Sequence, residues 1–236
     1  MLLPRVLLIK AGTAEPEIAA DFGDYDAWFE AALDDGAQRC DVVEAWQGET
    51  LPRASLYGGL VITGSPCSVR DEAPWMDGLA RWALAAAAAG VPVLGVCFGH
   101  QLLGEALGGR VEKNPGGGEH GSVFVELTEE GRRDPLFEGV NPRIDVLSSH
   151  DDAVVIAPKD QGVRRLAGNP SAAWQAFAAG PNLRAVQFHP EFPPDALRQL
   201  MRLRGQTGEV RPSPQGAQVL RNWDRHWVRR RPELGR

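Results

Sequence analysis

The feature that most constrains the fold is a buried strand that runs into a cysteine flanked by two glycines. The apolar stretch Val91–Val96 leads into Gly95-x-Cys97-x-Gly99, and a helical pattern begins near Phe98. A strand that turns this sharply into a helix needs glycines on both sides of the turn, since Cβ atoms would separate the helix from the strand. The sequence therefore predicts an α/β fold with Cys97 at the edge of its sheet.

The first hundred residues repeat this alternation of strands and helices, which is typical of a parallel sheet covered by helices. The strands that we expect here are Val6–Ile9, Asp41–Ala45, Gly59–Thr63 and Val91–Val96. The helices that we expect are Tyr25–Ala37 and Leu79–Ala89. The second helix contains five consecutive alanines, which favour a helix, and it stops before Gly90, a common residue at helix C-termini.

Beyond Gly109 the apolar runs become shorter and are separated by Gly and Pro, which indicates a mixed or antiparallel extension of the same sheet. The strands expected in this region are Ser122–Leu127, Ile144–Ser148, Val163–Leu166, Ala172–Phe177 and Arg184–Gln187. A helix is expected from Pro194 to about Arg204, and a last amphipathic helix carries Val219, Leu220, Trp223 and Trp227. We expect that last helix to pack on the body of the molecule, with an oligomer contact as the alternative.

These elements predict a single domain. A chain of 236 residues can bury a full core, and chains of about 200–250 residues often form one α/β domain. We expect a core at 6–192 and a helical extension at 193–236. The predicted architecture is an open, mostly parallel sheet with helices on both faces and a mixed or antiparallel extension.

Charge and composition argue against several classes of partner. The hydrophobic fraction of 43% and charged fraction of 24% are ordinary for a globular protein. The net charge of −6 gives no reason to expect nucleic acid, because phosphate binding needs clustered positive charge. Only the segment Arg221–Arg236 is basic, and we expect it to be solvated. No run of eighteen apolar residues occurs, so no membrane span is expected.

The cysteines and the N-terminus indicate a reducing, cytoplasmic setting. Cys40, Cys67 and Cys97 are too few and too irregularly spaced for a disulfide framework, and no CxxC pair indicates zinc. The first ten residues, MLLPRVLLIK, do not have the pattern of a cleavable signal peptide, and we interpret Val6–Ile9 as a buried strand.

Cys97 taken alone has two interpretations. At the start of a helix, free N–H groups and the positive end of the helix dipole favour the thiolate, which is the form that attacks a carbonyl. The same N–H groups can hold an oxyanion. The alternative is a small buried apolar residue, which is a common role of free cysteines.

A histidine and a carboxylate further along the chain favour the catalytic interpretation. In Gln187-Phe-His189-Pro-Glu191 an expected strand ends in a histidine, and a glutamate follows two residues on. A thiolate nucleophile needs a base that later protonates the leaving amine, and this base needs a group that fixes its tautomer. His189 and Glu191 supply both, so the sequence predicts Cys97, His189 and Glu191 as a catalytic triad.

A second glycine turn is expected at the same edge of the sheet. The strand Gly59–Thr63 ends in Gly64-Ser65-Pro, and the carboxyl ends of parallel strands meet at one edge. This turn is either an ordinary connection or the source of an N–H, from Gly64 or Ser65, that joins the N–H of Phe98 in an oxyanion hole.

Together these motifs resemble the class I glutamine amidotransferase domain, most closely its GMP synthase-like branch. The resemblance rests on Gly95-Val-Cys97-Phe-Gly-His-Gln101, the Ile-Thr-Gly64-Ser-Pro turn and the Gln187–Glu191 motif, which occur in the family order between about Val6 and Phe192. Weaker similarities are Lys113-Asn-Pro, Glu119-x-Gly121, Leu147-Ser-Ser-His150-Asp-Asp and Gln175-Ala-Phe. The resemblance implies a flavodoxin-like fold of the class I amidotransferase type.

The resemblance also implies roles for individual residues. Cys97 would be the nucleophile, His189 the general base and acid, and Glu191 its orienting partner. Gly64 and Phe98 would donate backbone N–H groups to the oxyanion. The residues that would hold the α-amino and α-carboxylate ends of a glutamyl substrate are Gln101, Ser148, Ser149 and His150.

Two departures from the family pattern leave the choice of substrate open. GMP synthase-like domains often carry Gly-Gly where this chain has Thr63-Gly64, and His-Gly-Asp where it has His150-Asp151-Asp152. The activity implied by the resemblance is hydrolysis of the glutamine side-chain amide through a γ-glutamyl thioester. We find no nucleotide-binding Ser-Gly-Gly-x-Asp-Ser loop or Walker motif, so a separate synthetase subunit is the expected acceptor of the ammonia.

Two other functions stay open. The γ-glutamyl peptidases share the Cys-Phe-Gly-His-Gln turn and would use the same thioester, so a stand-alone γ-glutamyl peptidase is one alternative. A non-catalytic regulator that binds a metabolite or a partner is the other. No cofactor or metal is expected, because a zinc site from Cys97, His100 and His150 would lack a second ligand pair. We expect His100 to pack beneath the site, and His120 and His226 to lie at the surface.

Overall fold

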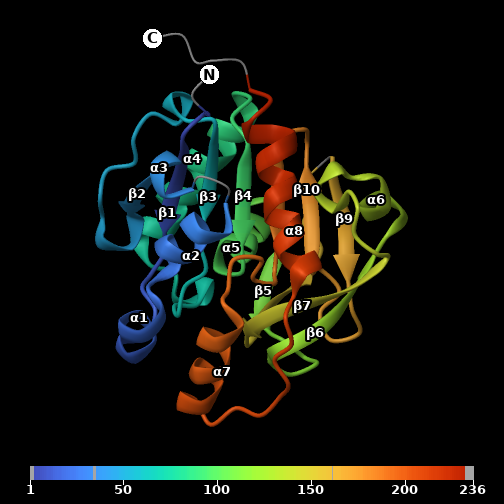
Figure 1. The fold of residues 1–236 in the computed structure, drawn as a ribbon. Helices are drawn as coiled ribbons and strands as arrows, with labels where there is room; N and C mark the ends of the chain where they lie inside the picture. The colour runs from blue at the N-terminus through green and yellow to red at the C-terminus, as the bar shows by residue number, and fades with distance from the viewer. Residues whose placement is uncertain (1–2, 34–35, 161, 232–236) are drawn as a thin grey trace.

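A nine-stranded sheet runs through the computed structural model, which describes residues 3–33, 36–160 and 162–231 (Figure 1). The spatial order of its strands is β2-β1-β3-β4-β11-β10-β9-β6-β7. Their bounds are β1 Val6–Lys10, β2 Cys40–Glu44, β3 Gly59–Ile62, β4 Val93–Val96, β6 Glu119–Leu127, β7 Arg143–His150, β9 Val163–Gly168, β10 Ala176–Ala179 and β11 Leu183–Val186.

The sheet changes from parallel to antiparallel pairing at β11, within the region beyond Gly109 for which the sequence predicts a mixed or antiparallel extension. From β2 to β11 neighbouring strands are parallel, and from β11 to β7 they are antiparallel. In Figure 1 the parallel strands run from the upper end of the molecule to the lower end, where α1 and α7 lie. This α/β class, with its parallel sheet and antiparallel extension, is confirmed. The carboxyl ends of β3, β4 and β11 consequently meet at one edge.

A separate two-stranded ribbon was not expected from the sequence. It consists of β5 (Arg110–Lys113) and β8 (Asp152–Ile156), which pair antiparallel. Three of the four residues of β5 are charged, so the strand lacks the apolar pattern by which strands are recognised. Its partner lies about forty residues away in the sequence, and the pairing places Lys113 opposite Asp152.

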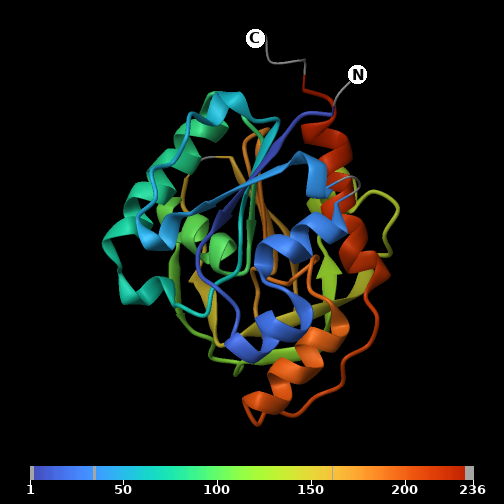
Figure 2. The same cartoon turned by 60° about the vertical axis from the view of Figure 1, so that its left-hand side comes forward.

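Helices cover both faces of the large sheet (Figure 2). They are α1 Pro16–Phe22, α2 Tyr25–Ala32, α3 Gly36–Arg39, α4 Pro74–Ala88, α5 Phe98–Ala106, α6 Glu129–Arg133, α7 Pro194–Leu203 and α8 Pro214–Trp223. Side chains from α2 and α8 share one apolar core with Leu8 and Val96, and side chains from α4 and α5 share another with Ile9 and Val93. Adjacent residues of one strand therefore enter opposite cores, as expected for a sheet buried on both sides.

Several element boundaries differ from the predicted ones. The expected helix Tyr25–Ala37 is wrong as one element: α2 ends at Ala32 and Leu33 is extended, with φ −91° and ψ 134°. Asp34 and Asp35 lie outside the described residues, and α3 follows at Gly36–Arg39. Helix α4 begins five residues before Leu79, with Pro74 in its first turn, where the missing N–H of proline costs nothing. Strand β10 begins at Ala176 rather than Ala172.

The C-terminal segment packs on the body, as predicted. Val219, Leu220 and Trp223 of α8 are fully buried, and Trp227, in the π-helical turn η5 (Asp224–Val228), donates its indole N–H to the carbonyl of Pro181 at 2.9 Å. Asp224 forms a buried ion pair with Arg39 at 2.7 Å, which ties this segment to α3. Among the described residues, no helix combines the length and the apolar character needed to cross a membrane.

Candidate active site

Cys97 occupies a strained turn between β4 and α5. Its backbone lies at φ 51° and ψ −100°, a region that residues with a Cβ rarely adopt and that is characteristic of functional sites. The glycines on either side allow this turn. A Cβ at Gly95 would lie 2.6 Å from the carbonyl oxygen of Gly99, and a Cβ at Gly99 would lie 2.5 Å from that of Ile62. The predicted sharp turn is therefore present, with the helix in direct contact with β3 and β4.

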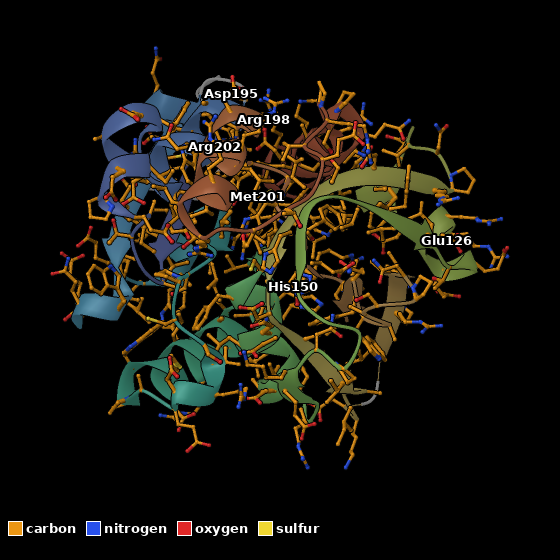
Figure 3. The ribbon with its side chains drawn as sticks, turned by 90° about the horizontal axis from the view of Figure 1, so that it is seen from below. Glu126, His150, Asp195, Arg198, Met201 and Arg202 are labelled. Carbon is orange, nitrogen blue, oxygen red and sulfur yellow. The ribbon has the colours of Figure 1, made fainter. Side chains whose placement is uncertain are left out.

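The Cys97 sulfur faces a cavity of about 240 Å³. Its Sγ lies 4.0 Å from the carbonyl oxygen of Ser149, at the end of β7. Figure 3 views the molecule from this end, with His150 near the centre, the labelled residues of α7 on one side, and Glu126 at the far end of β6. The cavity therefore lies where the parallel strands end and the antiparallel extension comes closest to them.

His189 and Glu191 lie next to Cys97 but outside the lining of this cavity, on what we call the inner side of the site. His189 follows β11, and its backbone N–H donates to the carbonyl of Leu147 at 2.8 Å. Its Nδ1 lies 2.7 Å from Oε1 of Glu191, and both side chains are buried, with 3% and 0% of their area exposed. Phe192 closes one side of the imidazole, edge to face, with ring centroids 5.1 Å apart. The ring has little freedom to turn, because packing and the carboxylate both hold it.

The electrostatic environment favours a protonated His189. Burial alone would lower the pKa of the ring, but the charges of Glu191 and Cys97, together with hydrogen bonds to both, outweigh burial and raise the pKa to about 10. By contrast, burial lowers the pKa of His100 to about 3. The His100 ring is fully buried against Phe177, with centroids 4.9 Å apart, and it contributes packing rather than charge.

Gly64 lies against the imidazole of His189. A Cβ at this position would lie 2.8 Å from Cε1 of the ring, so any larger residue would push the histidine aside. The neighbouring Thr63 is buried and donates its hydroxyl to the Gly64 carbonyl at 2.9 Å, which helps to fix the turn. Phe98 is the first residue of α5, where the backbone N–H has no acceptor within the helix.

The cavity brings together most, but not all, of the other predicted site residues. Phe98, Gln101, Ser149 and His150 line it together with Cys97. Gly64 and Ser148 are absent from the lining. The Ser148 hydroxyl is fully buried without a hydrogen-bond partner among the described residues. Gln101 Nε2 donates to the carbonyl of Asp152 at 2.8 Å and to Oε1 of Gln187 at 3.1 Å.

His150 is held by groups behind the cavity wall. Its Nε2 lies 3.0 Å from Oε2 of Glu119, and its Nδ1 lies 2.9 Å from the carbonyl oxygen of Asp152. The Glu119 carboxylate also accepts hydrogen bonds from Asn169 and Gln175, at 2.6 Å and 2.5 Å. Burial raises the pKa of Glu119, but these hydrogen bonds and the charge of His150 lower it below its usual value. This network fixes the end of β7, which carries the Ser149 carbonyl that faces Cys97.

Sequence reasoning missed much of the cavity wall. The lining also includes Ser65, Pro66, Cys67, Ser68, Arg70, Lys113, His120, Asp151, Asp152 and Arg204. His120 and His226, which were expected at the surface, are only partly exposed, with 15% and 9% of their side-chain areas accessible. Among residues 3–33, 36–160 and 162–231, no cluster of three or more His, Cys, Asp or Glu side chains is arranged to hold a metal ion.

Comparison with known proteins identifies the family to which this turn and sheet belong. The family model described as glutamine amidotransferase class-I matches residues 26–202. The chain belongs to the class I glutamine amidotransferase family. Over 181 residues it is 36% identical to a GMP synthase [glutamine-hydrolyzing] from Aeropyrum pernix, with 75% of this chain and 28% of the relative covered. This amidotransferase chain therefore spans about a quarter of the length of that relative.

Two further similarities agree with this assignment. One GMP synthase [glutamine-hydrolyzing] subunit, from Sulfurisphaera tokodaii, is 38% identical over 138 residues, which cover 57% of this chain and 68% of the relative. The crystal structure of a glutamine amido transferase from Methylobacillus flagellatus superposes with a TM-score of 0.73, at 21% identity and with 98% of each chain covered. The second similarity concerns the fold alone, and it extends to the helices beyond residue 202.

Proposed function

We propose that this amidotransferase hydrolyses the side-chain amide of glutamine through a γ-glutamyl thioester on Cys97, with His189 and Glu191 completing the triad. The observation that carries the proposal is the placement of Cys97. Cys97 lies on a strained turn in the lining of an open cavity, and the buried ring of His189, which pairs with Glu191, interacts with Cys97. A purely structural cysteine would need neither the strained backbone nor the buried charged partners.

In the first half of the reaction, the Cys97 thiolate attacks the amide carbon of the substrate. The negative charge moves to the carbonyl oxygen, which the backbone N–H groups of Phe98 and Gly64 stabilise. The intermediate collapses when His189 donates its proton to the departing nitrogen. Ammonia leaves, and a thioester joins the γ-carbonyl to Cys97.

In the second half, His189 acts as the base. It removes a proton from water, which attacks the thioester, and the tetrahedral intermediate expels the thiolate and releases glutamate. The imidazole is again protonated at the end of the cycle. Glu191 keeps its charge throughout and stabilises the imidazolium through the 2.7 Å hydrogen bond to Nδ1.

The ammonia would pass to a separate acceptor enzyme. The similarity to the GMP synthase subunit from Sulfurisphaera tokodaii supports this arrangement, because a protein named for one subunit of a synthase works with a second chain. A stand-alone γ-glutamyl peptidase would use the same steps with an amine in place of ammonia. The cavity beside Cys97 is open at the surface, which leaves room for a larger leaving group.

One experiment separates these functions. The purified chain is incubated with glutamine, glutathione and γ-glutamyl dipeptides, and glutamate, ammonia and released amine are measured, with Cys97→Ala as the control. Hydroxylamine is added in parallel, because it traps a thioester as γ-glutamyl hydroxamate. Hydrolysis of glutamine, alone or with a synthetase subunit, supports the proposal, and faster hydrolysis of peptides supports the peptidase. Absence of turnover and of hydroxamate with every substrate would leave the regulator as the remaining function.

A further inference from the structure

The imidazole of His189 belongs to a cluster of aromatic rings that reaches it from α2. Tyr25 packs edge to face on Trp28, with ring centroids 5.2 Å apart, and Trp28 packs on Phe192 at 4.5 Å. Phe192 in turn packs edge to face on His189. A methyl group on Gly64 would lie 2.8 Å from Cε1 of His189 and 3.5 Å from Cε1 of Tyr25, so these two rings are neighbours at Gly64. The four rings, which we call the aromatic cluster, therefore connect α2 to His189 by two routes.

The position of Tyr25 is fixed by the end of β1. Tyr25 is the first residue of α2, and its backbone N–H donates to Oδ1 of Asp24 at 2.7 Å. Oδ2 of Asp24 pairs at 2.8 Å with Nζ of Lys10, the last residue of β1, and only 7% of the Lys10 side chain is exposed. Trp28, on which the Tyr25 ring packs, is held by its indole N–H, which donates to the carbonyl of Phe22 at 2.9 Å. The sheet and the two ends of this helix therefore set where the Tyr25 ring lies.

Tyr25 lies close to the charged groups of the triad but adds no charge to them. Burial is the main reason that the pKa of its phenol lies well above the usual value, and nearby negative charges raise it further, from Cys97, Glu15 and Glu191. The charge of Arg204 acts in the opposite direction. Within the part of the chain that the structure describes, the Tyr25 hydroxyl has no hydrogen-bond partner. The phenol stays neutral, and its contribution to the site is therefore steric.

Different groups hold the sides of the His189 imidazole. Glu191 holds Nδ1 at 2.7 Å, and Phe192 packs against the ring. Gly64 has no side chain, so the turn after β3 does not itself fill the space at Cε1, and Tyr25 lies beside this space. A smaller residue at position 25 would leave a void into which the imidazole could turn, away from the nucleophile.

We propose that the ring of Tyr25 positions His189 and keeps its imidazole turned towards Cys97. This inference rests on the proposed function, because it concerns the alignment of the proposed base. Tyr25 is outside the lining of the cavity beside Cys97, so it acts through His189 and not through contact with the substrate. A misaligned base slows the proton transfers but leaves substrate binding intact. Loss of the ring should therefore lower kcat and leave KM nearly unchanged.

The test compares three variants in α2. Tyr25→Leu removes the ring, and Tyr25→Phe keeps the ring and removes the hydroxyl. The matched control is Phe29→Leu, which removes a fully buried ring one turn further along the same helix. Phe29 packs in the core that contains Leu8, whereas Tyr25 packs in the cluster that contains Phe192. The melting temperature of each variant is measured, so that kcat is determined on folded protein, and the two Leu variants should lose comparable thermal stability.

Tyr25→Leu should lower kcat for glutamine about 10–100-fold, with KM within about twofold of wild type. Tyr25→Phe should keep both constants within about twofold of wild type, and Phe29→Leu should keep kcat in spite of its lower melting temperature. Equal kcat in Tyr25→Leu and Phe29→Leu would overturn the inference, because the Tyr25 ring would then only support the fold. A Tyr25→Phe enzyme as slow as Tyr25→Leu would also overturn it, because the hydroxyl rather than the ring would then be responsible.

A titration without substrate keeps this inference distinguishable from the proposed function. The Cε1–H signal of His189 is followed by NMR as pH rises, and it is assigned by its absence from His189→Gln. Burial lowers the pKa of this ring, but the charges of Glu191 and Cys97 raise it to about 10, so an imidazole that has turned away from them should lose its proton at lower pH.

A titration midpoint at least about one unit lower in Tyr25→Leu than in Phe29→Leu and the wild type supports the inference. Equal midpoints in the three proteins overturn it. If the wild type hydrolyses no substrate, the proposed function fails, and this titration decides the inference alone.

Discussion

The two sides of Cys97 are built in different ways. On the inner side, His189 and Glu191 are almost completely buried, and Gly64 packs so closely that a Cβ would meet the imidazole. On the outer side, Arg70 and Asp151 expose 44% and 63% of their side chains. A change on the inner side disturbs packing and leaves a buried charge unpaired, whereas a change on the outer side costs little stability. We therefore expect the inner side to keep the chemical reaction the same, while the outer side determines the choice of substrate.

Removal of Cys97, the proposed nucleophile, should reduce activity more than any other substitution. Cys97→Ala should reduce hydrolysis by at least about 10⁴-fold, and His189→Ala should be nearly as damaging, because members of a triad act as a unit. Kinetics on the purified variants measure this, and circular dichroism checks that the fold is retained. Cys40→Ala, which removes a thiol outside the cavity, is the matched control and should keep most activity. Substantial turnover by Cys97→Ala would remove the covalent mechanism.

Glycine substitutions test the close packing behind the turn. A Cβ at Gly99 would lie 2.5 Å from the backbone carbonyl of Ile62, which cannot move away cheaply. Gly99→Ala should therefore lower the free energy of unfolding by about 1–3 kcal/mol and reduce activity as well. Gly78→Ala in α4 meets nothing within 4 Å and should raise that free energy by about 1 kcal/mol.

Denaturant unfolding of both glycine variants measures these free energies. Equal stability of Gly99→Ala and Gly78→Ala would show that the turn tolerates a Cβ. The inner side would then not be the rigid half of the site.

The charge of Glu191 should determine how His189 responds to pH. Glu191→Gln keeps an oxygen that can accept the hydrogen bond from Nδ1, but it removes the charge that raises the pKa of His189 towards about 10. Activity should fall by about 10–100-fold. Because the imidazolium then loses its proton at lower pH, the alkaline limb of the kcat/KM profile should shift to lower pH.

The Glu191→Gln substitution should also alter how the stability of the fold depends on pH. A raised pKa means that the protonated ring stabilises the fold at lower pH, and that this contribution is lost as pH rises through about 10. The alkaline loss of thermal stability should therefore be smaller in Glu191→Gln than in the wild type. An unchanged pH–rate profile in the variant would mean that Glu191 is not the partner of His189.

The difference between the inner and outer sides also explains which features could be predicted from the sequence. Cys97, its flanking glycines and the Gln187–Glu191 motif are local patterns in the sequence, and the structure places all three at the predicted edge. The parallel strands were also recognisable, because strands buried on both faces are continuously apolar. The changes of boundary at α2, α4 and β10 are local, and they leave the site where the sequence placed it.

The outer side depends on contacts between distant segments. Strand β5 is mostly charged and is defined by its pairing with β8, so no periodicity marks it. His120 is partly buried because Gln206, 86 residues further on, lies 3.2 Å from its Nε2. The ion pairs of Arg70 with Asp152 and of Arg204 with Glu15 at the cavity wall also join segments that are distant in the sequence. Such features follow from the tertiary structure and leave no local signal.

The smallest effect on activity is expected for a substitution of Asp152, where the outer side contacts the segment that follows Gly64. Asp152 accepts hydrogen bonds from the Ser68 hydroxyl at 2.5 Å and from Arg70 at 3.2 Å, and it thereby ties the segment after β3 to β8. Asp152→Asn keeps one acceptor oxygen for Ser68 and loses the charge that attracts Arg70. Because Arg70 is 44% exposed, the pair contributes at most about 1 kcal/mol, which corresponds to a rise in KM of about threefold to fivefold.

The backbone carbonyl of Asp152 still accepts the hydrogen bonds from Gln101 and His150 in this variant, so kcat should stay within about twofold of wild type. Kinetics at low and high salt give the sharper test, because screening weakens an exposed ion pair, and the difference in KM between the two enzymes should shrink as salt is added. A fall in kcat by more than about tenfold that persists at high salt would mean that the Asp152 carboxylate takes part in the chemistry. Asp152 would then belong to the catalytic inner side rather than to the outer side.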